Sequence, residues 1–221
     1  MFGPTLALLA FSSLPIETPA QATDQVQAVI AKMEEMGSVY LTRRPIAKTK
    51  KGERKDDPRK AVIIGVDFRP MSGSDSKKIA AIVGELAAMP HLETLLLLGM
   101  DVTDEAVEAI PVSPKLLSVQ FFNTRISDKG IATLPRFQKL QRFSFTGMGL
   151  TDEGMRSLAQ IKSLHTIIIT DAKVSDDGVL ALRSLPNLRQ LTVENTAATQ
   201  KSIDRLRESL PRLTNGERFL R

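Results

Sequence analysis

The chain has 221 residues, of which 42% are hydrophobic and 25% are charged, and its net charge is +5. These proportions are those of a globular protein with one domain of ordinary size and a short extension. The absence of cysteine excludes disulfides, thiolate metal sites and cysteine nucleophiles.

Residues 1–22 have features of a secretory signal peptide. Leu6 to Leu14 is an apolar stretch, and Ala20-Gln21-Ala22 is an A-x-A cleavage pattern, although no Lys or Arg precedes the stretch. The stretch is too short to span a membrane, and no other segment is apolar enough, so we expect no transmembrane segment. We expect a secreted, periplasmic or envelope protein, or a cytoplasmic one if residues 1–22 are not a signal.

Residues 23–60 are predicted to form a capping helix and a basic loop. Apolar residues recur at helical spacing from Val26 to Met36, so a helix is expected from Thr23, with Thr23 or Asp24 as N-cap and a stop at Gly37. A short strand over 38–42 follows. Residues 43–60 hold nine Lys or Arg against three Asp or Glu and no apolar periodicity, which favours an exposed loop.

Residues 61–213 contain a repeat of 24 residues. Its copies begin at leucines spaced 24 apart, which are Leu92, Leu116, Leu140, Leu164 and Leu188, after an irregular first copy that begins with 61–68. Each copy has a strand pattern, L-x-x-L-x-L, and then a helix pattern opened by Ser/Thr-Asp. This predicts an α/β fold, a right-handed leucine-rich repeat solenoid of about six repeats. Parallel strands would line its concave side and helices its convex side, with residues 214–221 as a C-terminal tail in which Phe219 and Leu220 could cover the last repeat.

The recurring Ser/Thr-Asp step allows two interpretations. Regularly spaced carboxylates could bind cations, or each Ser/Thr could cap its helix while the Asp interacts with the helix dipole. Capping is favoured, and the glycine at 130, 154 and 178 is interpreted as relief for a crowded turn. The two histidines, His91 and His165, are isolated from carboxylates at ligand spacing. We therefore predict no metal, no cofactor and no catalytic site.

The concave face is the candidate binding surface, because its strand positions between the core residues are free to vary. Leu96, Leu98 and Phe122 are apolar where neighbouring repeats are polar, and Gln120, Asn123 and Arg142 flank them. An apolar area with a polar rim is typical of a protein contact. The predicted partner-binding residues are Leu96, Leu98, Gln120, Phe122, Arg142, Ser144, Ile168 and Thr170.

The segments 123–131 and 149–155 resemble the G-T-x-[IV]-[ST]-D-x-G-L repeats of bacterial leucine-rich repeat proteins of the ribonuclease-inhibitor-like type. The lead-in segments 28–37 and 62–68 are also similar to that group. The resemblance covers about residues 24–213, and it implies exported or envelope-associated binding proteins without a cofactor. Ala106 and Ser202 depart from the pattern in place of glycine, and Gln200 in place of aspartate.

The predicted function is a non-catalytic scaffold that binds a protein partner through the concave face, as a monomer or weak oligomer. One alternative is an assembly module that stacks through its terminal edge. A second is binding of an anionic polymer or membrane surface by the basic loop, although nucleic acid is not expected. An enzyme that uses the repeats as a scaffold is the remaining alternative.

Overall fold

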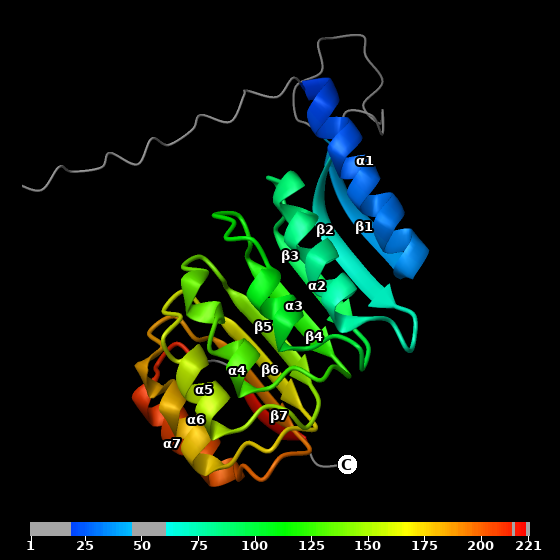
Figure 1. The fold of residues 1–221 in the computed structure, drawn as a ribbon. Helices are drawn as coiled ribbons and strands as arrows, with labels where there is room; N and C mark the ends of the chain where they lie inside the picture. Colours follow the sequence, from blue (N-terminus) through cyan, green and yellow to red (C-terminus); the bar gives the residue numbers. More distant parts are fainter. Residues whose placement is uncertain (1–18, 46–60, 214, 220–221) are drawn as a thin grey trace, which may run out of the picture.

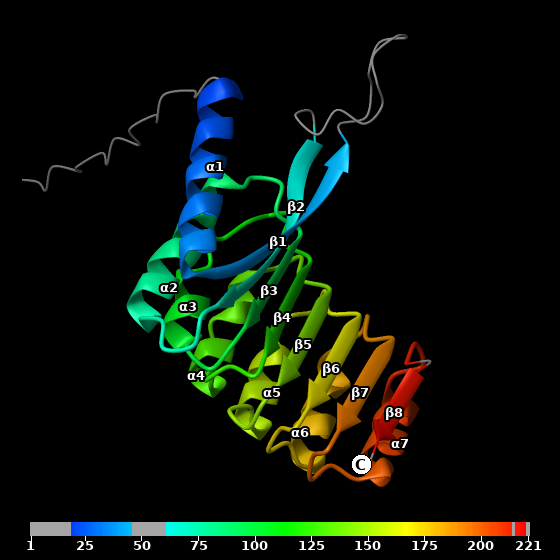
Figure 2. The ribbon, with the colours of Figure 1, turned by 90° about the vertical axis from the view of Figure 1, so that its right-hand side faces the viewer.

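The computed structural model describes residues 19–45, 61–213 and 215–219. Its centre is a single sheet of eight strands that lie in sequence order, and Figure 2 shows this sheet lining the inner side of an arc. The first strand is antiparallel to the second, and the other seven are parallel. The strands are β1 (Gly37–Pro45), β2 (Ala61–Pro70), β3 (Thr94–Leu98), β4 (Ser118–Phe122), β5 (Arg142–Thr146), β6 (Thr166–Thr170), β7 (Gln190–Glu194) and β8 (Asn215–Phe219).

Helices cover the outer side of the arc, one α-helix after each of the strands β2 to β7 (Figure 1). The α-helices are α1 (Pro19–Met36), α2 (Ser76–Gly84), α3 (Asp104–Ala109), α4 (Asp128–Ile131), α5 (Asp152–Leu158), α6 (Asp176–Ala181) and α7 (Gln200–Ser209). Three short 3-10 turns follow α2, α4 and α6, namely η2 (Glu85–Ala88), η3 (Leu134–Arg136) and η4 (Leu182–Ser184).

The strand register confirms the leucine-rich repeat solenoid. Equivalent core residues pair across the sheet at intervals of 24, and each of them is fully buried; they are Leu95, Val119, Phe143, Ile167 and Leu191. Val66 of β2 pairs with Leu95, so the first repeat is 29 residues long. The sheet has seven parallel strands rather than the six repeats expected, because β8 adds one more at the C-terminal end.

Aromatic side chains fill the middle of the core. The rings of Phe121 and Phe143 meet edge to face at 6.1 Å, and those of Phe143 and Phe145 stack at 6.3 Å. All three side chains are fully buried. The rings of Phe121 in the third repeat and Phe143 in the fourth meet across the repeat boundary, so the aromatic cluster ties the two repeats together.

The N-terminal unit differs from its prediction in two respects. Helix α1 begins at Pro19 rather than after a cap at Thr23 or Asp24, and it buries Val29, Ile30 and Met33 against the first repeat. Strand β1 extends to Pro45, so the start of the predicted basic loop is part of the sheet. Antiparallel pairing with β2 satisfies the backbone groups of this segment that face β2. Residues 46–60 and 1–18 lie outside the described residues.

At the other end, the segment expected to be a C-terminal tail contains β8. Its residues 215–219 pair in parallel with 190–194 of β7, which satisfies the edge of β7 with backbone hydrogen bonds rather than with a side-chain cap. Residues 214, 220 and 221, including the expected capping residue Leu220, lie outside the described residues.

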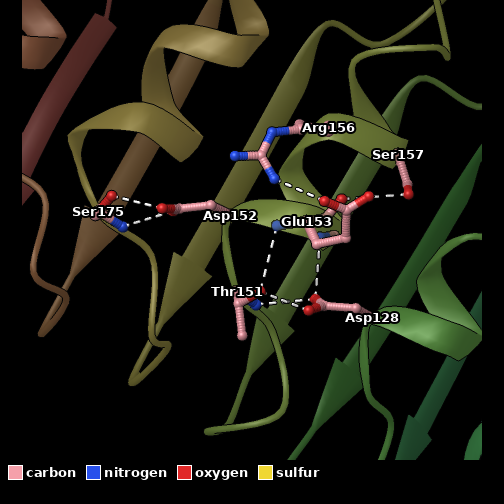
Figure 3. Close-up of polar contacts among 8 residues, drawn as sticks. Asp128, Thr151, Asp152, Glu153, Arg156, Ser157 and Ser175 are labelled. Atoms are coloured by element: carbon pink, nitrogen blue, oxygen red, sulfur yellow. Dashed lines mark hydrogen bonds and ion pairs between the residues drawn. The ribbon is translucent and has the colours of Figure 1, made fainter.

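The aspartate after each helix cap bonds to the next repeat, as Figure 3 shows for Asp128 and Asp152. The Asp128 carboxylate accepts hydrogen bonds from the Thr151 backbone N at 2.9 Å and its hydroxyl at 2.5 Å, and from the Gly154 N at 3.0 Å. Four such carboxylates form the row that we call the aspartate ladder, comprising Asp104, Asp128, Asp152 and Asp176. The expectation that these aspartates serve mainly their own helix dipole was therefore incomplete.

Three of the ladder hydroxyls have two partners each, while the Thr199 hydroxyl donates to Asp176 and does not cap α7. The Thr151 hydroxyl donates to Asp128 and also accepts from the Glu153 backbone N at 3.2 Å, so it caps its own helix as predicted. Ser127 and Ser175 repeat this arrangement. A carboxylate cap could not replace them, because it has no proton to donate to the incoming aspartate.

The same carboxylates explain the glycines of the repeat. A Cβ atom on Gly130, Gly154 or Gly178 would lie between 2.3 and 2.5 Å from a carboxylate oxygen of the preceding ladder aspartate. The turn is crowded as expected, since side chains of the glycine's own repeat also lie close, but the carboxylate of the preceding repeat is at least as near. In the last repeat, where Ser202 replaces glycine, hydrogen bonds from Thr199 and then Ser202 lower the pKa of Asp176.

The first repeat has no aspartate equivalent to those of the aspartate ladder. Asp75 of the first repeat caps its own helix by accepting from the Lys77 N at 2.9 Å, and the next residue, at the start of α2, is Ser76. The hydroxyl of Thr103, at the N-cap position of α3, makes no capping hydrogen bond and is buried without a partner among the described residues. Ala106, in the same repeat as Thr103, occupies the position that is glycine in the next three repeats. Because the first repeat has Ser76 in place of a ladder aspartate, no ladder carboxylate requires a glycine there.

Introducing a ladder aspartate in the first repeat should stabilise the protein only if Ser76 and Ala106 are both replaced. We expect Ser76→Asp to gain little in the wild-type background, since the Ala106 Cβ would crowd its carboxylate. Combined with Ala106→Gly, it should supply the missing acceptor to Thr103 and contribute about 1 kcal/mol of coupling energy. Thermal melting of the wild type, both single variants and the double variant measures this coupling, and strictly additive effects would contradict it.

Candidate functional site

The concave face is formed by every second side chain of the strands, since alternate residues of a strand point to opposite sides of a sheet. Along β3, burial alternates so that Leu95 and Leu97 are fully buried and their neighbours are half-buried. Strand register aligns the outward residues in three rows. These are Thr94, Ser118, Arg142, Thr166 and Gln190; Asp67, Leu96, Gln120, Ser144, Ile168 and Thr192; and Leu98, Phe122, Thr146, Thr170 and Glu194.

All eight residues predicted for the partner site lie in these rows. Leu98 of β3 pairs directly with Phe122 of β4, and Leu96 lies on the same face two residues before Leu98. These three half-buried side chains are here called the apolar patch. Ile168 is two strands away from β4, so it lies apart from the patch. Ser144 is only 9% exposed, which leaves it little surface for a partner.

Tyr40, which the sequence did not place on this face, extends it at the N-terminal end beside Asp67 and Arg69. Tyr40 of β1 is 60% exposed and pairs in register with Asp67. The guanidinium of Arg69 lies 5.2 Å from the centre of the Tyr40 ring and donates to the Asp67 carboxylate at 2.9 and 3.1 Å. The hydrogen bond to Asp67 raises the pKa of Arg69. Tyr40 thus adds an exposed aromatic ring beside a compact ion pair.

Exposed methionines lie just beyond the strands, on the rim of the concave face. Met100 and Met148 are 58% and 61% exposed, and each follows a glycine with positive φ, Gly99 at 124° and Gly147 at 146°. Where Asn123 takes the place of glycine, with φ of 52°, the next residue, Thr124, is buried. Methionine is a flexible apolar side chain that is common at adaptable binding surfaces. The glycine turns therefore add apolar surface to the rim.

Charged residues at the two edges of the solenoid have structural roles. Because all the repeat helices run in one direction, their N-termini share one edge, where the ladder aspartates lie, and their C-termini share the other. At the second edge the Arg136 guanidinium donates to the carbonyl oxygens of Val107 at 2.7 Å and Ile110 at 2.9 Å. Burial lowers the pKa of Arg136. Lys162 likewise donates to the carbonyl oxygen of Ala159 at 2.8 Å.

Possible metal ligands do not cluster in the described part of the chain. It contains no group of three or more His, Asp or Glu side chains that could hold a metal ion. The ladder carboxylates are engaged by backbone and hydroxyl donors instead. His91 lies beside Lys115, with 2.6 Å between its Nδ1 and the Lys115 Nζ. No described helix is long and apolar enough to cross a membrane.

Comparison with known proteins finds similarity to solved structures. No protein-family model and no curated protein sequence matches the chain. Among solved structures the chain is similar to an internalin C2 from Listeria monocytogenes, with 21% sequence identity and a TM-score of 0.44. The match covers 63% of this chain and 56% of the internalin chain, so this chain spans little more than half of that structure. The strand register and the stacked helices themselves define the chain as a leucine-rich repeat solenoid.

Proposed function

We propose that the protein is a non-catalytic scaffold that binds a protein partner through its concave face. The observation that carries this proposal is the apolar patch, in which Leu98 pairs with Phe122, Leu96 lies two residues before Leu98, and all three side chains are partly exposed. Tyr40, which pairs with Asp67 of the outward row, extends the apolar surface on the same face. A monomeric protein gains nothing from leaving such residues in contact with water, whereas a partner that covers them gains hydrophobic free energy.

The partner can be identified by site-specific cross-linking in cells that make the protein. A photoreactive amino acid in place of Gln120 lies next to the apolar patch, and the same residue in place of Gln160, exposed after α5 on the helical side, is the matched control. We expect a discrete cross-linked protein from position 120 and not from position 160. Equal products from both positions, or cross-links to nucleic acid alone, would argue against the concave face.

Once the partner is purified, Leu98→Asp and Phe122→Asp should each weaken its binding about 30-fold, as expected for a central contact worth about 2 kcal/mol. Calorimetric titration measures this change, with Gln160→Asp as the variant that should bind normally. Melting curves close to that of the wild type show that the loss arises from the surface and not from unfolding. Unchanged affinity in both variants would contradict the proposed site.

The proposed location is the cell envelope or the medium, on the basis of the A-x-A pattern at residues 20–22. A cut after Ala22 would remove only the first turn of α1, and the buried residues Val29, Ile30 and Met33 would remain. The mature protein would therefore keep its N-terminal packing. N-terminal sequencing of protein isolated from the source cells tests this proposal: a start at Thr23 supports export, and a start at Met1 contradicts cleavage.

Assembly through the terminal edge is a second candidate, and one observation favours it. Strand β8 is the last strand of the sheet, so its outer edge offers backbone donors and acceptors to another strand. Analytical ultracentrifugation across a concentration series distinguishes this mode from the first. Reversible association that persists in Phe122→Asp would support edge pairing, and a monomer at all concentrations would dismiss it.

A further inference from the structure

We propose that the partner of the concave face presents a carboxylate to Arg142 and, about four residues away, an apolar side chain to the apolar patch. This inference rests on the proposed function and adds the chemistry of the partner. Its basis is the distribution of charge on the concave face, taken together with the strand register.

Arg142 is an isolated charge on this face. Strands β3 to β6 offer three outward positions each, and Arg142 is the only charged residue among these twelve. Its direct neighbours in register are Ser118 and Thr166. Its side chain is exposed and makes no hydrogen bond or ion pair with any described residue. In contrast, Arg69 at the N-terminal end is already paired with Asp67.

A guanidinium in such a position is suited to a carboxylate. It offers a planar pair of donors that a carboxylate accepts in parallel, and a partner that covers the face would strengthen the pair by excluding water. The surrounding side chains are hydroxyls and an amide, which can bond to a ligand but cannot neutralise the charge. A partner without an acidic group would therefore bury Arg142 unpaired, at a cost that selects against it.

The strand register sets the distance between Arg142 and the Phe122 side chain of the apolar patch. Phe122 pairs with Thr146, which lies four residues beyond Arg142 on β5. At about 3.3 Å per residue this is roughly 13 Å along the strand direction. An extended segment of the partner covers the same distance in about four residues. The expected recognition element is thus an Asp or Glu separated by about three residues from a large apolar residue.

Selection from a displayed library of random 12-residue peptides tests this inference with the full chain as bait. We expect the wild type to enrich peptides with an acidic and an apolar residue at the stated spacing. Arg142→Glu should exchange the acidic preference for Lys or Arg. Arg183→Glu, an exposed guanidinium on η4 away from this face, is the matched control and should return the wild-type consensus. A synthetic peptide of that consensus should bind Arg142→Gln about 30-fold more weakly than the wild type.

The possible outcomes separate the two proposals. Peptides that are lost with Phe122→Asp but show no acidic preference would overturn this inference and leave the proposed function standing. The same acidic consensus from Arg142→Glu, or no enrichment on the wild type, would also overturn it. Binding of a thymidine oligonucleotide that Arg142→Glu abolishes would assign Arg142 to an anionic polymer instead, which overturns the inference as well.

Discussion

Phe121→Asp should prevent the protein from folding. The Phe121 side chain is fully buried and meets the ring of Phe143 at 6.1 Å, so the substitution removes an aromatic contact and places a carboxylate in a core without a polar partner. We expect a loss of at least 5 kcal/mol, which is comparable to the whole stability of an ordinary domain. Far-UV circular dichroism and thermal melting measure the result, and we expect no cooperative transition.

Its neighbour provides the matched control. Phe122 points to the opposite side of the same strand and is partly exposed, so Phe122→Asp should cost no more than about 1 kcal/mol and keep a cooperative melt. The pair tests the register of the entire sheet, because a shift by one residue would exchange the two faces. A normally folded Phe121→Asp with an unfolded Phe122→Asp would reverse the faces and move the candidate site elsewhere.

The solenoid could be predicted from the sequence because every repeat packs its apolar residues in the same way. Each strand must place two apolar residues inward, and the next strand must match them, so the spacing between Leu95, Val119 and Phe143 is the register of the sheet itself. The ends were harder to predict for the same reason. Strands β1 and β8 have a neighbour on one side only, and their sequences do not repeat the pattern. The spacing of apolar residues in β1 does not indicate that this strand pairs antiparallel with β2.

The aspartate ladder shows where a local interpretation fails. Within one repeat, Ser127-Asp128 has the form of a cap and a first-turn acid, and both expectations are locally correct. The partner of Asp128 is Thr151, 23 residues later, and only stacking brings the two together. A signal was nevertheless present. Glycine follows a ladder aspartate at Gly130, Gly154 and Gly178, whereas Ala106 follows the first repeat, which has no ladder aspartate. Ser202, which follows Asp176, is the exception.

The candidate site was partly predictable for a different reason. The outward rows follow from the strand register, so Leu96, Leu98 and Phe122 could be placed on one face without a structure. Tyr40 could not, because its position on that face depends on the antiparallel pairing of β1. The burial of Ser144 was also beyond the pattern, since the equivalent residues of the other repeats are only partly buried.

Asp128→Ala should be the most destabilising change of a surface-edge residue. It removes the acceptor of three hydrogen bonds, two of which come from backbone N–H groups at Thr151 and Gly154. These donors are part-buried, so water replaces the carboxylate incompletely, and we expect a loss of about 3 kcal/mol. For a chain of this size that corresponds to a fall in melting temperature of roughly 10 °C. Asp177→Ala is the control: that aspartate is exposed on the same edge, and its removal should change stability by less than about 0.5 kcal/mol.

A double-mutant cycle decides whether this loss comes from the contact between repeats or from the helix dipole of α4. Thr151→Ala removes the hydroxyl that donates to Asp128, so the double variant should lose about 1 kcal/mol less than the sum of the single variants. A dipole effect would be independent of Thr151 and would give additive losses, which would contradict the ladder. The ladder interpretation also implies that the loss is shared by two repeats, since Asp128 belongs to one and its donors to the next. Hydrogen exchange of Asp128→Ala should accordingly show faster exchange at the Thr151 and Gly154 amides, while amides of the first repeat keep their protection.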